Sequence, residues 1–132
     1  MKASMQIVFI LLAAFTKESC AYNIGTSWRN TAAFAALKTD GSVVTWGDSD
    51  YGGDSSSVSS LLSSGVSVIY STAGAFAALK TDGSVVTWGD SANGGDSSSV
   101  SSSLSSGIVS IVCLSSAFCA LKQNGNPVFL LD

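Results

Sequence analysis

The stretch that decides the fold is AFAALKTDGSVVTWGD, residues 75–90, in which two apolar segments flank an Asp-Gly pair. The segment 75–80 has the length and apolar content of a strand, and 85–88 is β-branched and aromatic. Asp82-Gly83 between two such runs is a strong β-hairpin signal. The type I′ turn that this pair favours requires positive φ at both central residues. We therefore expect an antiparallel hairpin closed by a type I′ turn.

The hairpin belongs to a repeat with a period of 42 residues. Residues 33–65 recur as 75–107, and 30 of these 33 positions are identical. The three differences are Asp50/Ala92, Tyr51/Asn93 and Leu61/Ser103. A third copy begins at Ala117 and decays after Lys122, although Asn124-Gly125 keeps the turn chemistry. A fixed period in the forties is typical of propeller or solenoid units, which cannot bury their faces alone.

A serine-rich segment separates one hairpin from the next, over residues 54–65 and 96–107. In the first copy, apolar residues at helical spacing lie between an acidic residue and a glycine that could cap a helix: Val58, Leu61 and Leu62, with Asp54 and Gly65. We expect a helix of one or two turns, and a flexible low-complexity linker is the alternative. Short strands at 66–69 and 108–111 are expected to lead into the following hairpins.

This unit resembles the repeat of the regulator of chromosome condensation family. The signature of that family is a strand ending in leucine, an Asp-Gly turn, a strand ending in Trp-Gly, a glycine-rich turn and a Val/Ile-x-x-Ile strand. The matching positions are Leu79, Asp82, Gly83, Val85, Trp88, Gly89 and Gly94, and in the other copy Leu37, Asp40, Gly41, Val43, Trp46, Gly47 and Gly52. The resemblance covers roughly residues 24 to 129. It implies a β-propeller of radially arranged four-stranded blades.

The sequence also departs from that family. Ala75 stands where members often carry histidine, and Gly-Gly-Asp replaces the Gly-Gln-Leu-Gly turn. The family closes a ring of about seven blades, whereas this sequence supplies at most three. We therefore expect a mainly β fold: tandem blade-like antiparallel hairpin repeats of an incomplete β-propeller, with short Ser-rich helices or loops between units. The units are about 24–65, 66–107 and 108–132. Three alternatives remain for such a chain. It is a fragment of a longer repeat array, a subunit that closes a ring as a homo-oligomer, or a degenerate copy of the repeat.

Residues 1–21 are expected to form a secretory signal peptide. Lys2 precedes an apolar run of nine residues, 7–15, and Ser19 and Ala21 supply small residues before a cleavage site. The run is shorter than the roughly 20 residues that span a bilayer. A membrane anchor and a buried part of the fold are the alternatives. We expect a secreted or extracellular protein of residues 22–132 with no stable membrane span after cleavage.

Two cysteines, Cys113 and Cys119, would remain after this cleavage. Export permits a disulfide. Whether these two form one or stay as small buried residues is left open, because spacing alone does not decide it.

Composition opposes catalysis and nucleic-acid binding. The chain has no histidine, which removes Ser-His-Asp and Cys-His catalysis as usually built. Its net charge is −3, whereas nucleic-acid binding requires a basic surface. We expect no enzyme activity, no cofactor and no nucleic-acid partner. The acidic charge and the export signal also oppose a chromatin or guanine-exchange role taken from the family name.

The candidate site residues lie in two acidic, glycine-containing loops: Asp48, Asp50, Tyr51 and Asp54 in one copy, and Asp90, Asn93 and Asp96 in the other. Carboxylates near alternate positions occur in calcium loops, but the second copy loses its middle carboxylate and no distal glutamate follows. We favour turn and cap roles, and expect no bound metal.

Trp46 and Trp88 could form an aromatic platform for a ligand. We favour the alternative, in which they pack between blades. Lys38, Lys80 and Lys122 precede the turns and are expected to face solvent.

From these observations we expect a non-catalytic secreted or surface repeat protein that binds another protein or a glycan through its propeller loops. The alternative is a structural or orphan fragment of a longer repeat array with no activity of its own.

Overall fold

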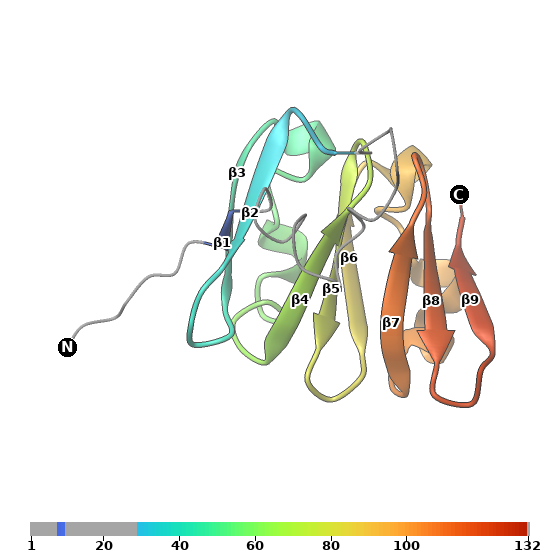
Figure 1. The fold of residues 1–132 in the computed structure, drawn as a ribbon. Coiled ribbons are helices and arrows are strands. Elements are labelled where there is room, and N and C mark those ends of the chain that lie inside the picture. Colours follow the sequence, from blue (N-terminus) through green and yellow to red (C-terminus); the bar gives the residue numbers. More distant parts are fainter. Residues whose placement is uncertain (1–7, 10–28, 132) are drawn as a thin grey trace.

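A computed structural model describes residues 8–9 and 29–131 of the chain and shows three antiparallel sheets that follow one another along the sequence (Figure 1). The first sheet contains β1 (Val8–Phe9), β2 (Ala33–Leu37) and β3 (Val43–Gly47). The second contains β4 (Val66–Ser71), β5 (Ala75–Lys80) and β6 (Val85–Gly89). The third contains β7 (Ile108–Cys113), β8 (Phe118–Lys122) and β9 (Pro127–Leu130). The mainly β prediction is confirmed.

The expected hairpins are present, but their turn type is not the expected one. The Gly41 N–H donates to Lys38 O over 3.0 Å, and the Lys38 N–H donates to Ser42 O over 2.8 Å. Among the described residues every positive φ belongs to a glycine, Gly41 included, so Asp40 does not adopt the conformation that a type I′ turn requires. The arrangement is a type I turn followed by a left-handed glycine. The type I′ prediction was wrong.

The aspartate side chain explains this turn. One carboxylate oxygen of Asp40 accepts from the Ser42 N–H at 3.0 Å and from the Ser42 hydroxyl at 2.6 Å. The Asp82–Ser84 pair repeats both bonds. Such local hydrogen bonds hold the aspartate in an ordinary turn conformation, so only the glycine needs the left-handed region.

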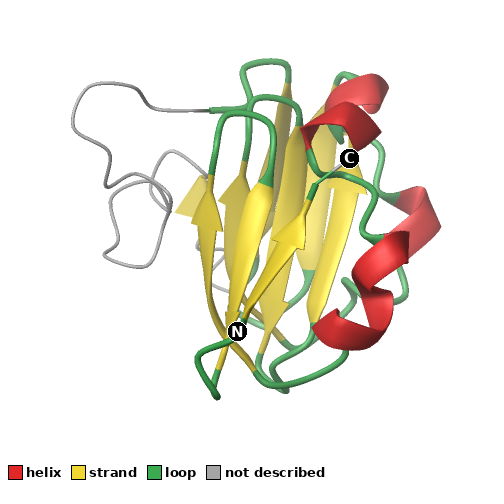
Figure 2. Cartoon of the chain, turned by 90° about the vertical axis from the view of Figure 1, so that its right-hand side faces the viewer, coloured by secondary structure: helices red, strands yellow, loops and turns green. Residues whose placement is uncertain are grey.

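Four short 3₁₀ helices connect the hairpins: η1 (Ser49–Tyr51), η2 (Ser56–Val58), η3 (Ser91–Asn93) and η4 (Ser98–Leu104). Figure 2 shows the helices together on one side of the strands. The helix expected over 54–65 is limited to η2, and the one over 96–107 to η4. None of the described helices is long and apolar enough to cross a membrane.

The sheets pack face to face in chain order around two apolar cores. Between the first and second sheets, Ala33 and Ala35 meet Phe76, Val86 and Trp88, with further contributions from Leu62, Val66, Ile69 and Ala78. Between the second and third sheets, the core contains Tyr70, Ala77, Leu79, Val85, Leu104, Ile108, Ile111, Phe118, Ala120 and Leu130. The second sheet therefore buries both of its faces on its neighbours, and the first and third sheets each bury one.

Backbone hydrogen bonds at the hairpin tips join each unit to the next. The Val66 N–H at the start of β4 donates to Gly41 O over 2.9 Å, and the Thr81 N–H donates to Gly65 O over 2.8 Å. The next junction repeats the pattern: Ile108 donates to Gly83, and Gln123 donates to Gly107. The junction brings the glycines so close that a Cβ on Gly41 would lie 2.9 Å from the Gly65 nitrogen.

One detail differs from what the family resemblance implies. Each sheet has three strands among the described residues, instead of the four strands of a propeller blade. The expected start of the first unit, at about residue 24, lies outside the described residues. Next to β2 lies β1, with Val8 opposite Leu37 and Phe9 opposite Ala36. Val8 and Phe9 belong to the segment 1–21 that we expect to be a signal peptide, and their pairing with β2 corresponds to the alternative in which this segment is part of the fold.

Candidate functional site

The two acidic loops are built in the same way after β3 and after β6. Asp48 caps η1, because one of its carboxylate oxygens accepts from the Asp50 N–H over 3.0 Å. Asp90 caps η3 by accepting from the Ala92 N–H over 2.9 Å. Each helix then ends at a glycine with a positive φ, 97° at Gly52 and 91° at Gly94. A glycine adopts this conformation without the steric cost that a Cβ would add.

Two polar residues fix these loops from the sheet side. The Asn30 side-chain amide donates to Tyr51 O over 2.6 Å, and Thr72 Oγ1 donates to Asn93 O over 2.8 Å. Both side chains are buried and also accept from the backbone of the following strand. Asn30 and Thr72 occupy equivalent positions, 42 residues apart. Sequence analysis missed them, because they differ in type and lie outside the near-identical segment.

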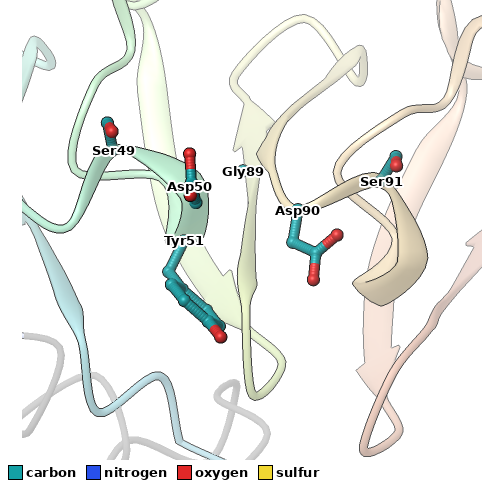
Figure 3. Close-up of a pocket in the computed structure, with 6 residues that line it drawn as sticks. All are labelled: Ser49, Asp50, Tyr51, Gly89, Asp90 and Ser91. Atoms are coloured by element: carbon teal, nitrogen blue, oxygen red, sulfur yellow. The ribbon is translucent and has the colours of Figure 1, made fainter.

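A hollow of about 620 Å³ lies between the loop of the first unit and the loop of the second (Figure 3). It is lined by Ser49, Asp50 and Tyr51 of the η1 loop and by Gly89, Asp90 and Ser91 at the end of β6 and the start of η3. Of the seven candidate residues, the structure brings together Asp50, Tyr51 and Asp90 here. The residues that line this hollow include no basic side chain.

The hollow combines an aromatic ring with hydrogen-bond acceptors. Asp50 and Asp90 contribute carboxylates, Ser49 and Ser91 contribute hydroxyls, and Tyr51 contributes its ring. Asp90 uses one oxygen as the cap and the other to accept from the Asn93 side-chain amide at 2.6 Å. The lining therefore suits a ligand that carries hydroxyl or cationic donors and an apolar face.

The other acidic candidates serve the chain itself. Asp54 accepts from the Ser56 N–H over 2.8 Å, and Asp96 from the Ser98 N–H over 2.9 Å. These backbone N–H groups, helped by the hydroxyls of the same serines, lower the pKa of both carboxyls below their usual value. Within the described ranges, no three Asp, Glu, Cys or His side chains come together as a metal site would require.

The two tryptophans of the repeat have different surroundings. Trp88 is buried, stacks on Phe76 with ring centroids 5.4 Å apart, and donates from Nε1 to Gly52 O over 3.1 Å. Trp88 thus packs between units. Trp46 stacks on Phe34 at 5.6 Å, and this pair is exposed on the first sheet.

One lysine differs from expectation, and the structure answers the question that the sequence left open for the two cysteines. Lys80 Nζ donates to Leu61 O over 2.7 Å, so this lysine contacts the preceding unit instead of only facing solvent. Cys119 carries a free thiol, whereas Cys113 is disulfide-bonded. No bridge therefore joins Cys113 to Cys119.

Comparison with known proteins finds similarity among solved structures. No family model matches the chain, and no curated protein matches it. Among solved structures, the chain is similar to the entire ectodomain of the receptor kinase CR4 from Physcomitrella patens, with a TM-score of 0.49 and 19% sequence identity. The match covers 76% of this chain and 28% of that one, so the chain spans less than a third of the ectodomain.

Proposed function

We propose that this chain is a non-catalytic, exported repeat protein that binds another protein or a glycan in the hollow between η1 and η3. The three sheets act as blades of an incomplete propeller, and the loops at one edge of neighbouring blades form the binding site. The absence of histidine from the sequence supports a role without acid-base chemistry. The apolar run at 7–15 and the small residues Ser19 and Ala21 support export.

One observation carries the binding proposal. Two of the three positions that differ between the otherwise identical copies are 50/92 and 51/93, and they lie in η1 and η3. Asp50 and Tyr51, the residues of the first copy, line the hollow. The other lining residues are common to both copies, so the unshared positions contribute the second carboxylate and the aromatic ring of the hollow.

The chain offers its own matched variants for a test. Asp50→Ala with Tyr51→Asn gives η1 the sequence of η3, where Ala92 and Asn93 occupy the same helical positions. The backbone is therefore expected to stay unchanged, while the hollow loses one carboxylate and its aromatic ring. Leu61→Ser makes the third exchange between the copies at an exposed position that does not line the hollow.

The experiment compares these variants on immobilised oligosaccharides and on a library of peptides. We expect the wild-type chain to bind some of the oligosaccharides or some of the peptides, and Leu61→Ser to bind the same ones. The double variant is expected to lose at least tenfold in affinity, about 1.4 kcal/mol. If the wild-type chain binds neither panel, or if the double variant binds as well as wild type, the hollow is not the binding site.

A further inference from the structure

The first sheet exposes a face that is buried in the second sheet. Phe34, Val44 and Trp46 lie on one side of β2 and β3, because Phe34 pairs with Trp46 and Val44 pairs with Ala36. Their exposed fractions are 37%, 46% and 40%. The same residues of the next unit, Phe76, Val86 and Trp88, are exposed by 0%, 7% and 3%. We call Phe34, Val44 and Trp46 the head face.

The third sheet exposes its opposite side. Val112, Cys119 and Phe129 lie opposite one another across β7, β8 and β9, and Leu121 lies on the same side of β8. Val112, Leu121 and Phe129 are exposed by 57%, 39% and 54%. The residues at the equivalent positions of the second unit, Tyr70, Leu79 and Thr87, are exposed by 3%, 8% and 8%. We call Val112, Leu121 and Phe129 the tail face.

Inside the chain, a face of the head type packs on a face of the tail type. Phe76, Val86 and Trp88 of the second sheet pack on Ala35 of the first, with Leu37 and Val43 at the margin of the same core. Ala35, Leu37 and Val43 of the first sheet are equivalent to Cys119, Leu121 and Pro127 of the third sheet. The second and third sheets repeat this arrangement. The two open faces are therefore the two halves of an interface that the chain already makes twice.

The tail face does not resemble a polar cap. In soluble repeat arrays, the repeat faces that remain in contact with solvent are polar. Here Phe129 replaces the polar Thr87, and Val112 replaces Tyr70 with its hydroxyl. Figure 1 places the first and third sheets at opposite ends of the row, so the two faces cannot cover each other within one chain.

We infer that the protein self-associates head to tail: the head face of one copy packs on the tail face of a second copy. The interface is heterologous, so it builds rings where the rotation closes and filaments where it does not. This inference does not depend on the hollow between η1 and η3, and either can fail without the other.

Light scattering on the full chain tests it through two variants and their mixture. The wild type is expected to exceed its single-chain mass of 13.4 kDa as the concentration rises. Val44→Lys on the head face and Phe129→Lys on the tail face are each expected to stay at the single-chain mass. An equimolar mixture of the two is expected to give a complex of two chains, because one intact head face and one intact tail face remain. Leu61→Lys, at an exposed position outside both faces, is expected to associate like wild type.

Several results would overturn the inference. They are a wild type that stays at the single-chain mass, a Val44→Lys chain that associates as wild type does, and a mixture that forms no two-chain complex. Association of the Val44→Lys chain would show that two tail faces pack on each other. Circular dichroism confirms that each variant keeps its strands, and Trp46→Lys and Leu121→Lys serve if the first pair does not fold.

Discussion

Single glycines determine how closely the units approach. Gly83 has a φ of 81°, and a Cβ there would lie 2.9 Å from the Gly107 nitrogen of the next unit. Gly125 has a φ of 88° at the equivalent turn, with nothing within 4 Å of such a Cβ. Gly125→Ala is expected to cost about 1–2 kcal/mol for the left-handed conformation alone. Gly83→Ala adds a clash with backbone and is expected to cost at least about 1 kcal/mol more.

Urea denaturation of the two alanine variants measures this difference directly. Because both positions carry the same conformational cost, their difference isolates the contact between units. Equal losses in the free energy of unfolding would contradict the close approach of Gly83 to Gly107.

Asp40 and Asp82 in the hairpin turns make the free energy of unfolding depend on pH. The Ser84 hydroxyl and then the Ser84 N–H hold the pKa of Asp82 below its usual value, and Ser42 does the same for Asp40. Carboxylates with a lowered folded-state pKa stabilise the protein above the unfolded-state pKa of about 3.9. This contribution is lost as the pH falls through the folded-state pKa.

Asparagine at both turns is expected to weaken this acid dependence. In the third unit the Asn124 side-chain oxygen already accepts from the Asn126 N–H at 3.0 Å, so an amide can hold the same turn. The urea midpoint of Asp40→Asn/Asp82→Asn is therefore expected to change less than that of wild type between about pH 6 and pH 3. An equal change in both proteins would show that these two carboxylates do not contribute.

At the level of elements, Trp88 and Trp46 have the same sequence neighbours and different structural roles. Trp88→Phe removes the donor to the buried Gly52 carbonyl, and an unsatisfied buried group costs about 1–3 kcal/mol. Trp46→Phe changes an exposed residue and is expected to alter stability by no more than about 0.5 kcal/mol. Urea unfolding at a concentration where the chain is a monomer compares them, and equal losses would contradict the role assigned to Trp88.

The hairpins could be predicted because their signals are local. An apolar segment, an Asp-Gly pair and a β-branched segment define β5, the turn and β6 within sixteen residues, 75–90. The helices were harder, because serine hydroxyls compete for backbone carbonyls. Ser63 donates to Ser60 O, and Ser105 donates to Ser102 O, each over 2.8 Å. The segments therefore form the short 3₁₀ helices η2 and η4, whereas the i, i+3, i+4 spacing of the apolar residues indicated α-helical turns.

At the level of the whole molecule, the candidate site depends on contacts distant in sequence. Asn30 holds Tyr51 from 21 residues away, and Thr72 holds Asn93 at the same separation. The hollow forms only because the first and second sheets stack, which places Asp50 beside Asp90. The sequence identified these acidic residues as loop candidates. It did not show which of them would meet, because that depends on how one unit packs on another.

The repeated interface also affects how the gene encoding this chain can change in length. Both junctions use the same backbone contacts at the hairpin-tip glycines, and in both a loop glycine lies against a phenylalanine of the next unit, Phe76 or Phe118. A recombination event that adds or removes 42 residues in register leaves every remaining junction with a partner it already fits. An insertion of another length inside a strand instead shifts the residues that follow it out of register with the neighbouring strands. Lengthening by whole units is therefore structurally neutral, and the number of sheets can vary without any new interface having to evolve.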